Sequence, residues 1–146
     1  MIRALVKEGR IEDGEAERYL VETLIKRRDK IVRCYLGRSN PLDDFQIRGS
    51  GESRRIEFKN LAVDSRLASS PSYRYQWFRF NNETGVETAL ADSQTSSDAS
   101  LQMPQSDRDY LLLRIGMISP EHPNWEKDVA VYLRTSGTAR VVGIDR

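Results

Sequence analysis

Apolar residues recur at helical spacing along the first quarter of the chain. Asp13 precedes the main run as a helix N-cap, and Gly37 follows it as a stop. A shorter amphipathic stretch, residues 2–6, comes before the cap. The side chains expected along the apolar side of the long helix are Tyr19, Leu20, Leu24, Ile31 and Tyr35. The pattern therefore predicts one short and one long helix within residues 1–37.

From residue 54 onward the apolar period changes to two, which is typical of half-buried strands. Turn residues such as Asn81 and Gly137 separate the alternating runs and favour hairpins. Residues 40–45, between the helix and the first strand, are expected to form a loop. The predicted strands cover residues 55–63, 73–80, 86–90, 109–119, 128–134 and 140–144. Residues 54–146 are thus predicted to form an antiparallel sheet of about five or six strands.

Two segments lack a regular apolar period. Residues 91–106 are rich in Ser, Asp, Gln and Thr, and we expect a mobile loop there because the segment has few apolar side chains to bury. Residues 119–125 contain Pro120 and Pro123, which keep the segment out of a regular ladder. We expect this second segment to hold Trp125 against the core.

A helix stripe and a sheet face must each be buried against another element. We therefore expect a single α+β domain over residues 1–146, in which the helix packs on a curved, mostly antiparallel sheet. Leu24 of the helix and Leu113 of the strand are then both core residues. This order of elements is similar in layout to the cone-shaped NTF2-like and cystatin-like folds.

Composition supports a water-soluble globule of one domain. Hydrophobic residues make up 38% of the chain and charged residues 31%, which leaves enough apolar area for one core. No stretch approaches the roughly 20 apolar residues that a membrane-spanning helix needs, and the first residues lack a secretory signal pattern. We expect no membrane insertion; the compartment is left unknown, although the absence of a signal favours the cytoplasm. An extracytoplasmic location stays open if the chain is an excised part of a larger bacterial protein.

Charge and residue counts exclude several functional classes. Lys plus Arg outnumber Asp plus Glu by only 23 to 22, so the net charge does not favour nucleic acid. Cys34 is the single cysteine and His122 the single histidine, so neither a disulfide nor a zinc-type ligand set is expected. The chain has no phosphate-binding glycine loop and no nucleophile-elbow motif. We expect no metal, no cofactor and no catalytic role for His122.

The segment of residues 73–80 is the most unusual in composition, because five of its eight residues are aromatic and two are arginine. It fits either a central strand or a surface for a ligand or partner. Strand alternation places its first aromatics on one face, while Arg114 belongs to the mixed face of the predicted strand 109–119. The candidate ligand-binding or partner-binding residues are Tyr73, Tyr75, Trp77, Arg79, Arg114 and Trp125.

These observations favour a non-catalytic binding or protein-interaction domain. Its partner would be an unknown protein or a small apolar ligand, and a homodimer is left open. The alternative is a small-substrate enzyme or a carrier with a pocket inside the curled sheet. Perturbed titratable groups in a deep pocket would favour the alternative, and an exposed apolar patch would favour the interaction domain.

Overall fold

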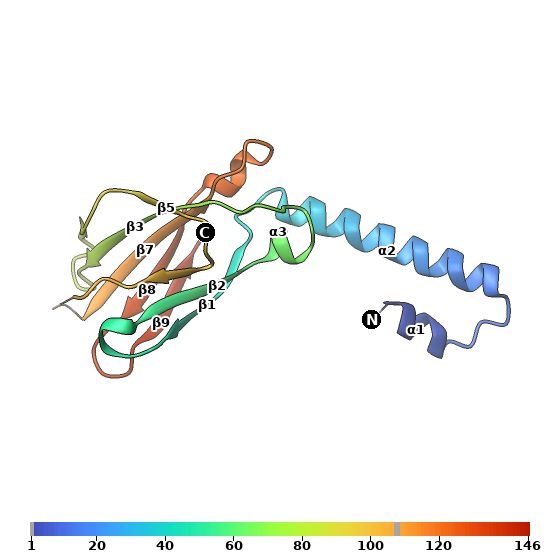
Figure 1. Ribbon diagram of the computed structural model, residues 1–146, viewed down its shortest axis with the longest axis horizontal. Coiled ribbons are helices and arrows are strands. Elements are labelled where there is room, and N and C mark those ends of the chain that lie inside the picture. The colour runs from blue at the N-terminus through green and yellow to red at the C-terminus, as the bar shows by residue number, and fades with distance from the viewer. Residues whose placement is uncertain (1, 107–108) are drawn as a thin grey trace. The chain divides into compact units, whose positions relative to one another are not determined.

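The computed structural model describes residues 2–106 and 109–146 (Figure 1). Within these residues it contains three α-helices and nine strands, and every strand pairing is antiparallel. The predicted α+β class is confirmed. By its internal contacts the chain divides into two compact units, one ending at Tyr35 and the other beginning at Leu36. We call them the helical unit and the β unit; that the whole chain forms one domain stays a prediction.

The helical unit contains both predicted helices, α1 (Ile2–Glu8) and α2 (Gly14–Leu36), although α2 contributes its last residue to the β unit. Asp13 caps α2 because its Oδ1 accepts hydrogen bonds from the backbone N–H groups of Glu15 at 2.8 Å and Ala16 at 3.4 Å. These contacts satisfy N–H groups that have no partner inside the helix. Val6 and Val21 are the buried residues of the two helices.

The β unit begins with a three-stranded sheet, in the order β1-β2-β6. Its strands are β1 (Leu42–Arg48), β2 (Arg55–Asn60) and β6 (Ser100–Gln102). A one-turn helix, α3 (Leu61–Asp64), follows β2, and the Asn60 side chain caps it by accepting from Ala62 N and Val63 N. The buried Asn60 therefore ends the strand and starts the helix.

The second sheet has six strands, of which five run in the order β4-β3-β7-β8-β9 while β5 also pairs with β3. Its strands are β3 (Tyr73–Phe80), β4 (Glu87–Ala89), β5 (Gln94–Ser96), β7 (Tyr110–Met117), β8 (Val129–Arg134) and β9 (Arg140–Asp145). The central register sets Trp77 opposite Leu113 and Leu113 opposite Val131. The strands predicted at residues 73–80, 86–90, 109–119, 128–134 and 140–144 are confirmed, whereas the strand predicted at residues 55–63 ends at Asn60, where the cap of α3 begins.

The core of the β unit lies between its two sheets. Ile56 and Phe58 of β2 belong to the same buried cluster as Leu113 of β7 and Val131 of β8. The sheet face that we expected a helix to cover is therefore packed against a second sheet. The finer expectation of an NTF2-like or cystatin-like layout, with the helix packed on one curled sheet, is not confirmed.

Two segments predicted as loops contain strands. Residues 42–45 belong to β1, whose alternation is masked in the sequence by a register shift between Asp43 and Gln46 and by a positive φ of 51° at Asp44. Residues 91–106 include β5 and β6, and their two buried residues, Leu101 and Met103, join the core. The sequence did not identify Leu101 and Met103 as core residues, because they are the only two buried side chains in an otherwise polar segment.

Asn40 ties the start of the β unit to two distant segments. Its Nδ2 donates to the backbone oxygens of Trp125 at 3.0 Å and Lys127 at 2.8 Å, with a longer contact of 3.3 Å to that of Ile115. Its Oδ1 accepts from Leu42 N at 3.0 Å. Asn40 is only 5% exposed, so its amide satisfies buried backbone groups that have little access to water.

Candidate functional site

Tyr73 and Trp77, two of the predicted site residues, point into the core of the β unit and are 1% and 7% exposed. The Tyr73 ring packs edge-on against Phe58 with 5.0 Å between centroids, and its hydroxyl accepts from Asn60 Nδ2 at 3.1 Å. Burial raises the pKa of Tyr73. Trp77 Nε1 is buried without a hydrogen-bond partner among the described residues. Both residues contribute to packing, and a role in binding stays a prediction for them.

Trp125 is also a core residue, with 1% of its surface exposed. Its indole Nε1 donates to the backbone oxygen of Leu36, and the His122 ring stacks on it at 3.9 Å between centroids. The irregular segment of residues 119–125 thus holds Trp125 in place, as the sequence predicted. His122 has an aromatic neighbour and a structural position, and its predicted lack of a catalytic role stays a prediction.

Arg114 lies on the opposite face of the six-stranded sheet from the core and forms a bidentate ion pair with Glu87. Its Nε and Nη2 donate to the Glu87 carboxylate at 2.7 to 3.0 Å, and its guanidinium lies 5.9 Å from the Phe78 ring centroid. These hydrogen bonds raise the pKa of Arg114 further above its usual value. Both partners are partly solvated, so the pair fixes geometry more than it adds stability.

Next to this ion pair, a group of apolar side chains covers the same face, and we call it the outer aromatic cluster. Cross-strand pairing aligns Phe78, Leu112 and Tyr132, and Phe80 meets the Tyr132 ring at 5.0 Å. Leu112 is fully buried beneath its neighbours. The cluster consists of Phe78, Phe80, Leu112 and Tyr132. It explains why strand β3 carries aromatics on both faces: one set enters the core and the other forms this cluster.

Tyr75 and Arg79 complete the predicted set; Tyr75 lies within β3 and Arg79 near its end. Tyr75 is half-buried, packs against the core and donates its hydroxyl hydrogen to Gln94 Oε1 at 2.8 Å. Arg79 is exposed at the end of β3. The structure therefore distributes the six predicted residues over the core, the outer face and the strand end, and does not bring them together in one site.

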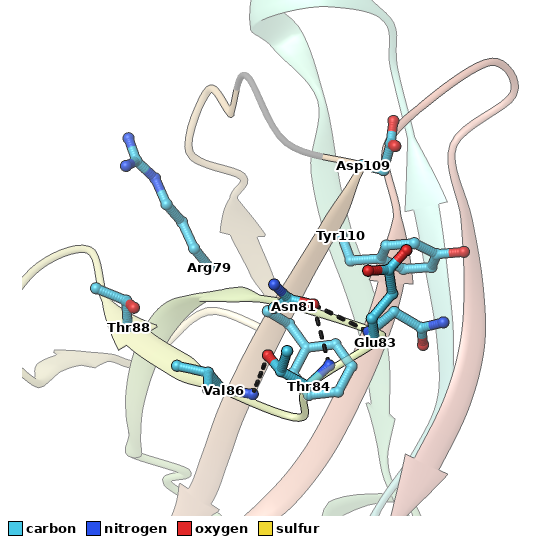
Figure 2. Close-up of a pocket in the computed structure, with 10 residues that line it drawn as sticks. Arg79, Asn81, Glu83, Thr84, Val86, Thr88, Asp109 and Tyr110 are labelled. Atoms are coloured by element: carbon cyan, nitrogen blue, oxygen red, sulfur yellow. Dashed lines mark hydrogen bonds between the residues drawn. The ribbon is translucent and has the colours of Figure 1, made fainter.

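An open pocket of about 700 Å³ lies at the end of the β3–β4 hairpin (Figure 2). Its hairpin wall is held by Asn81, whose Oδ1 accepts from Glu83 N at 2.9 Å and Thr84 N at 3.2 Å. In Figure 2 the Arg79 side chain points away from the carboxylates of Glu83 and Asp109. The lining residues are Arg79, Phe80, Asn81, Asn82, Glu83, Thr84, Val86, Thr88, Asp109 and Tyr110.

The chemistry of this pocket is that of a polar recognition surface. Glu83 and Asp109 supply hydrogen-bond acceptors, Asn82 supplies an amide, and Tyr110 supplies a hydroxyl and a ring. Within residues 2–106 and 109–146, no group of three His, Cys, Asp or Glu side chains could hold a metal ion. Sequence reasoning missed this pocket because it is assembled by a turn and a strand that are distant in the chain.

Four exposed apolar side chains of the long helix lie along one side of it, whereas Tyr19, which is 74% exposed, lies outside this line. Successive residues of an α-helix turn by about 100°, so residues 20, 24, 31 and 35 fall within an arc of about 60°. We call this set, Leu20, Leu24, Ile31 and Tyr35, the α2 stripe. Their exposed fractions are 38%, 37%, 51% and 74%. Leu24 is therefore not among the buried residues of the helical unit, and its expected packing on the sheet stays a prediction.

Comparisons with known proteins gave no assignment: no family model, curated protein or solved structure matches the chain. In the part of the chain that the structure describes, no helix combines the length and apolar character needed to cross a membrane. Among the described residues, the exposed apolar stripe of α2 and the polar pocket of the β unit both have the chemistry of a binding surface.

Proposed function

We propose that this chain is a non-catalytic protein-interaction module, in which α2 offers the contact surface and the β unit is a folded scaffold. The α2 stripe carries this proposal. Three aliphatic side chains of a single helix, Leu20, Leu24 and Ile31, are each more than a third exposed. Exposed apolar residues scattered singly need no explanation, whereas several of them aligned on one side of a helix are typical of a surface that a partner covers.

The packing of the β unit also favours an interaction module over an enzyme with a pocket inside the sheet. Leu111, Ile115 and Val131 face the space between the two sheets and have no exposed surface. The interior is therefore occupied by side chains. This filled interior is a second reason to prefer the interaction module.

The pocket of Figure 2 supports a second candidate, recognition of a small polar ligand at the hairpin end. Carboxylates at Glu83 and Asp109 suit a ligand that bears amine or hydroxyl donors, and Tyr110 provides a ring for an apolar edge. We rank this candidate second because the pocket is open and most of its wall is an exposed turn.

The proposal is tested by truncating the side chains of the α2 stripe and measuring the variant at low protein concentration, where the chain is monomeric. Replacing Leu20, Leu24 and Ile31 together by alanine should leave the free energy of unfolding within about 1 kcal/mol of the wild-type value, because exposed truncations cost little and alanine favours helix. Binding of an apolar dye such as anilinonaphthalene sulfonate should fall in the same variant. Urea unfolding and dye fluorescence measure the two quantities.

The matched control replaces Glu22, Lys26 and Lys30, exposed residues of the same helix, by alanine. It changes helix propensity to a similar degree but spares the stripe, so dye binding should be retained. A loss of several kcal/mol in the stripe variant alone would show that these side chains belong to the fold. That result would overturn the interaction module and favour a buried helix.

A further inference from the structure

The α2 stripe is arranged symmetrically along its helix. Leu24 lies three residues before Arg27 and Ile31 three residues after Arg28, while Leu20 and Tyr35 lie seven residues before and after the same two arginines. A two-fold axis through the Arg27–Arg28 peptide and perpendicular to the helix would therefore superpose the stripe on itself. In an isologous dimer of antiparallel helices each contact between residues i and j occurs twice, so the contact positions along the helix must have this symmetry.

From this symmetry we propose that α2 pairs with α2 of a second copy of the chain, in an antiparallel arrangement across the stripe. The inference rests on the proposed interaction function and names its partner. In this pairing Leu24 packs against Ile31 of the second copy and Leu20 against Tyr35. Two helices in contact have axes about 8 to 10 Å apart, which these side chains fill.

The charge distribution along α2 selects the antiparallel orientation. Residues 14–25 contain three acidic residues and one basic residue, whereas residues 26–36 contain five basic residues and one acidic residue. An antiparallel pair sets each acidic half beside the basic half of the second copy, and a parallel pair sets like charges together. At this spacing the charges lie within about one Debye length, and they favour one orientation more than they add affinity. The acidic residues are Glu15, Glu17, Glu22 and Asp29; the basic residues are Arg18, Lys26, Arg27, Arg28, Lys30 and Arg33.

The two arginines at the centre oppose the pairing and limit its strength. Arg28 is already paired within its own helix, because its Nε and Nη2 donate to Asp29 Oδ1 at 2.8 and 2.6 Å. Arg27 meets its counterpart across the axis at a cost in affinity. With four apolar side chains from each copy, the contact is smaller than a standard stable interface. The dimer is therefore concentration-dependent, and Arg27→Leu should tighten it.

Sedimentation equilibrium of the full chain, from low micromolar to about 1 mM, tests the pairing. We expect a reversible monomer–dimer equilibrium whose Kd rises at least tenfold in the double variant Leu24→Gln and Ile31→Gln. The control variant, Val86→Gln and Val142→Gln, changes two exposed valines of the β unit and should keep Kd within twofold. A wild-type protein that stays monomeric, or a dimer that the stripe variant does not weaken, would overturn the proposal.

Disulfide crosslinking of the dimer tests whether the two α2 helices run antiparallel. In the antiparallel pair the two Cys34 side chains lie about 20 Å apart along the helices, so mild oxidation of the wild type should give little crosslinked dimer. In a Cys34→Ser background, Arg27→Cys places both thiols beside the axis and should crosslink efficiently. Efficient crosslinking through Cys34 would contradict the antiparallel arrangement.

The two proposals fail in different ways. The interaction module is contradicted by a loss of stability in dilute monomer when the stripe is truncated. The antiparallel dimer is contradicted by sedimentation or crosslinking, with the stability of the monomer unchanged. A stable stripe variant combined with a wild type that never dimerises would retain the interaction module and assign the stripe to a different protein partner.

Discussion

The β unit and the helical unit use their apolar residues in opposite ways. In the β unit, leucines and valines of neighbouring strands face a second sheet, and residues such as Leu113 and Val131 have no exposed surface. In the helical unit, residues of the same types lie along α2 with more than a third of their surface exposed. Apolar periodicity specifies which element forms, but a second layer is needed to bury it.

This difference has an energetic meaning. Burial of an aliphatic side chain contributes about 1.5 to 3 kcal/mol, and an exposed one contributes little to folding. Most of the stability that the chain gains from apolar residues should therefore come from the β unit. The following predictions vary one residue at a time to break or sharpen that contrast, beginning with the largest expected loss.

Asn40→Asp should cost the β unit about 3 to 5 kcal/mol at neutral pH, because a buried carboxylate would face the backbone oxygens that the amide now satisfies. This surrounding raises the pKa of the introduced acid, so the loss should shrink at low pH, where the carboxyl is neutral, and grow as the pH rises through its folded-state pKa. Urea unfolding at several pH values measures the effect. A loss that does not depend on pH would argue against a buried charge at this position.

Leu113→Ala should lower the free energy of unfolding by about 2 to 5 kcal/mol, since the side chain is fully buried between the sheets. Leu24→Ala removes the same atoms from α2, where the side chain is 37% exposed, and should cost less than about 1 kcal/mol. Chemical denaturation of both variants compares the two regions directly. Equal losses at the two positions would abolish the contrast between the units.

Gly116→Ala should destabilise the β unit by about 1 to 3 kcal/mol. A Cβ at Gly116 would lie 2.7 Å from the backbone oxygen of Glu126, so the chain on one side must move. Gly143→Ala in β9 is the matched control, because its Cβ would meet only the Tyr132 ring at 3.6 Å. Thermal unfolding should give a lower melting temperature for Gly116→Ala than for Gly143→Ala. An unchanged melting temperature in Gly116→Ala would show that the backbone around Glu126 shifts at little cost.

His122→Ala should have the smallest effect on function. The ring stacks on Trp125, so its loss should cost no more than about 1 kcal/mol of stability. A thermal-shift screen can supply a ligand, whose affinity is then compared in the two proteins. A tenfold drop in affinity without loss of stability would place His122 in a binding site and promote the enzyme alternative.

The sequence pattern predicted the helices and strands more successfully than it predicted which of them pack together. The N-cap at Asp13 and the alternation around Leu113 specified α2 and β7 because both signals depend on neighbours in sequence. β1 escaped prediction because a bulge and the positive φ at Asp44 interrupt its period. The second sheet was missed as the partner of the first, since nothing local in the sequence states which layer covers a face.

The candidate site was predictable only in part for the same reason. The aromatic composition of residues 73–80 drew attention to β3, which is paired on both sides within the larger sheet, but Tyr73 and Trp77 serve packing there. Leu20 and Ile31 are exposed because no other element of the helical unit packs over them in the described residues. Their helical spacing could be predicted from the sequence, but their exposure could not.

The segment that carries β5 and β6 links the two sheets, and this has a kinetic consequence. Its first strand pairs with β3 in one sheet and its second with β2 in the other, and the backbone N–H of Met103 donates to Arg54 O at 3.0 Å just beyond it. Both docking edges must exist before this segment can attach, and the pairing of Ile56 with Leu101 closes a long loop. We therefore expect attachment of the segment to be a late step in folding and its release an early step in unfolding.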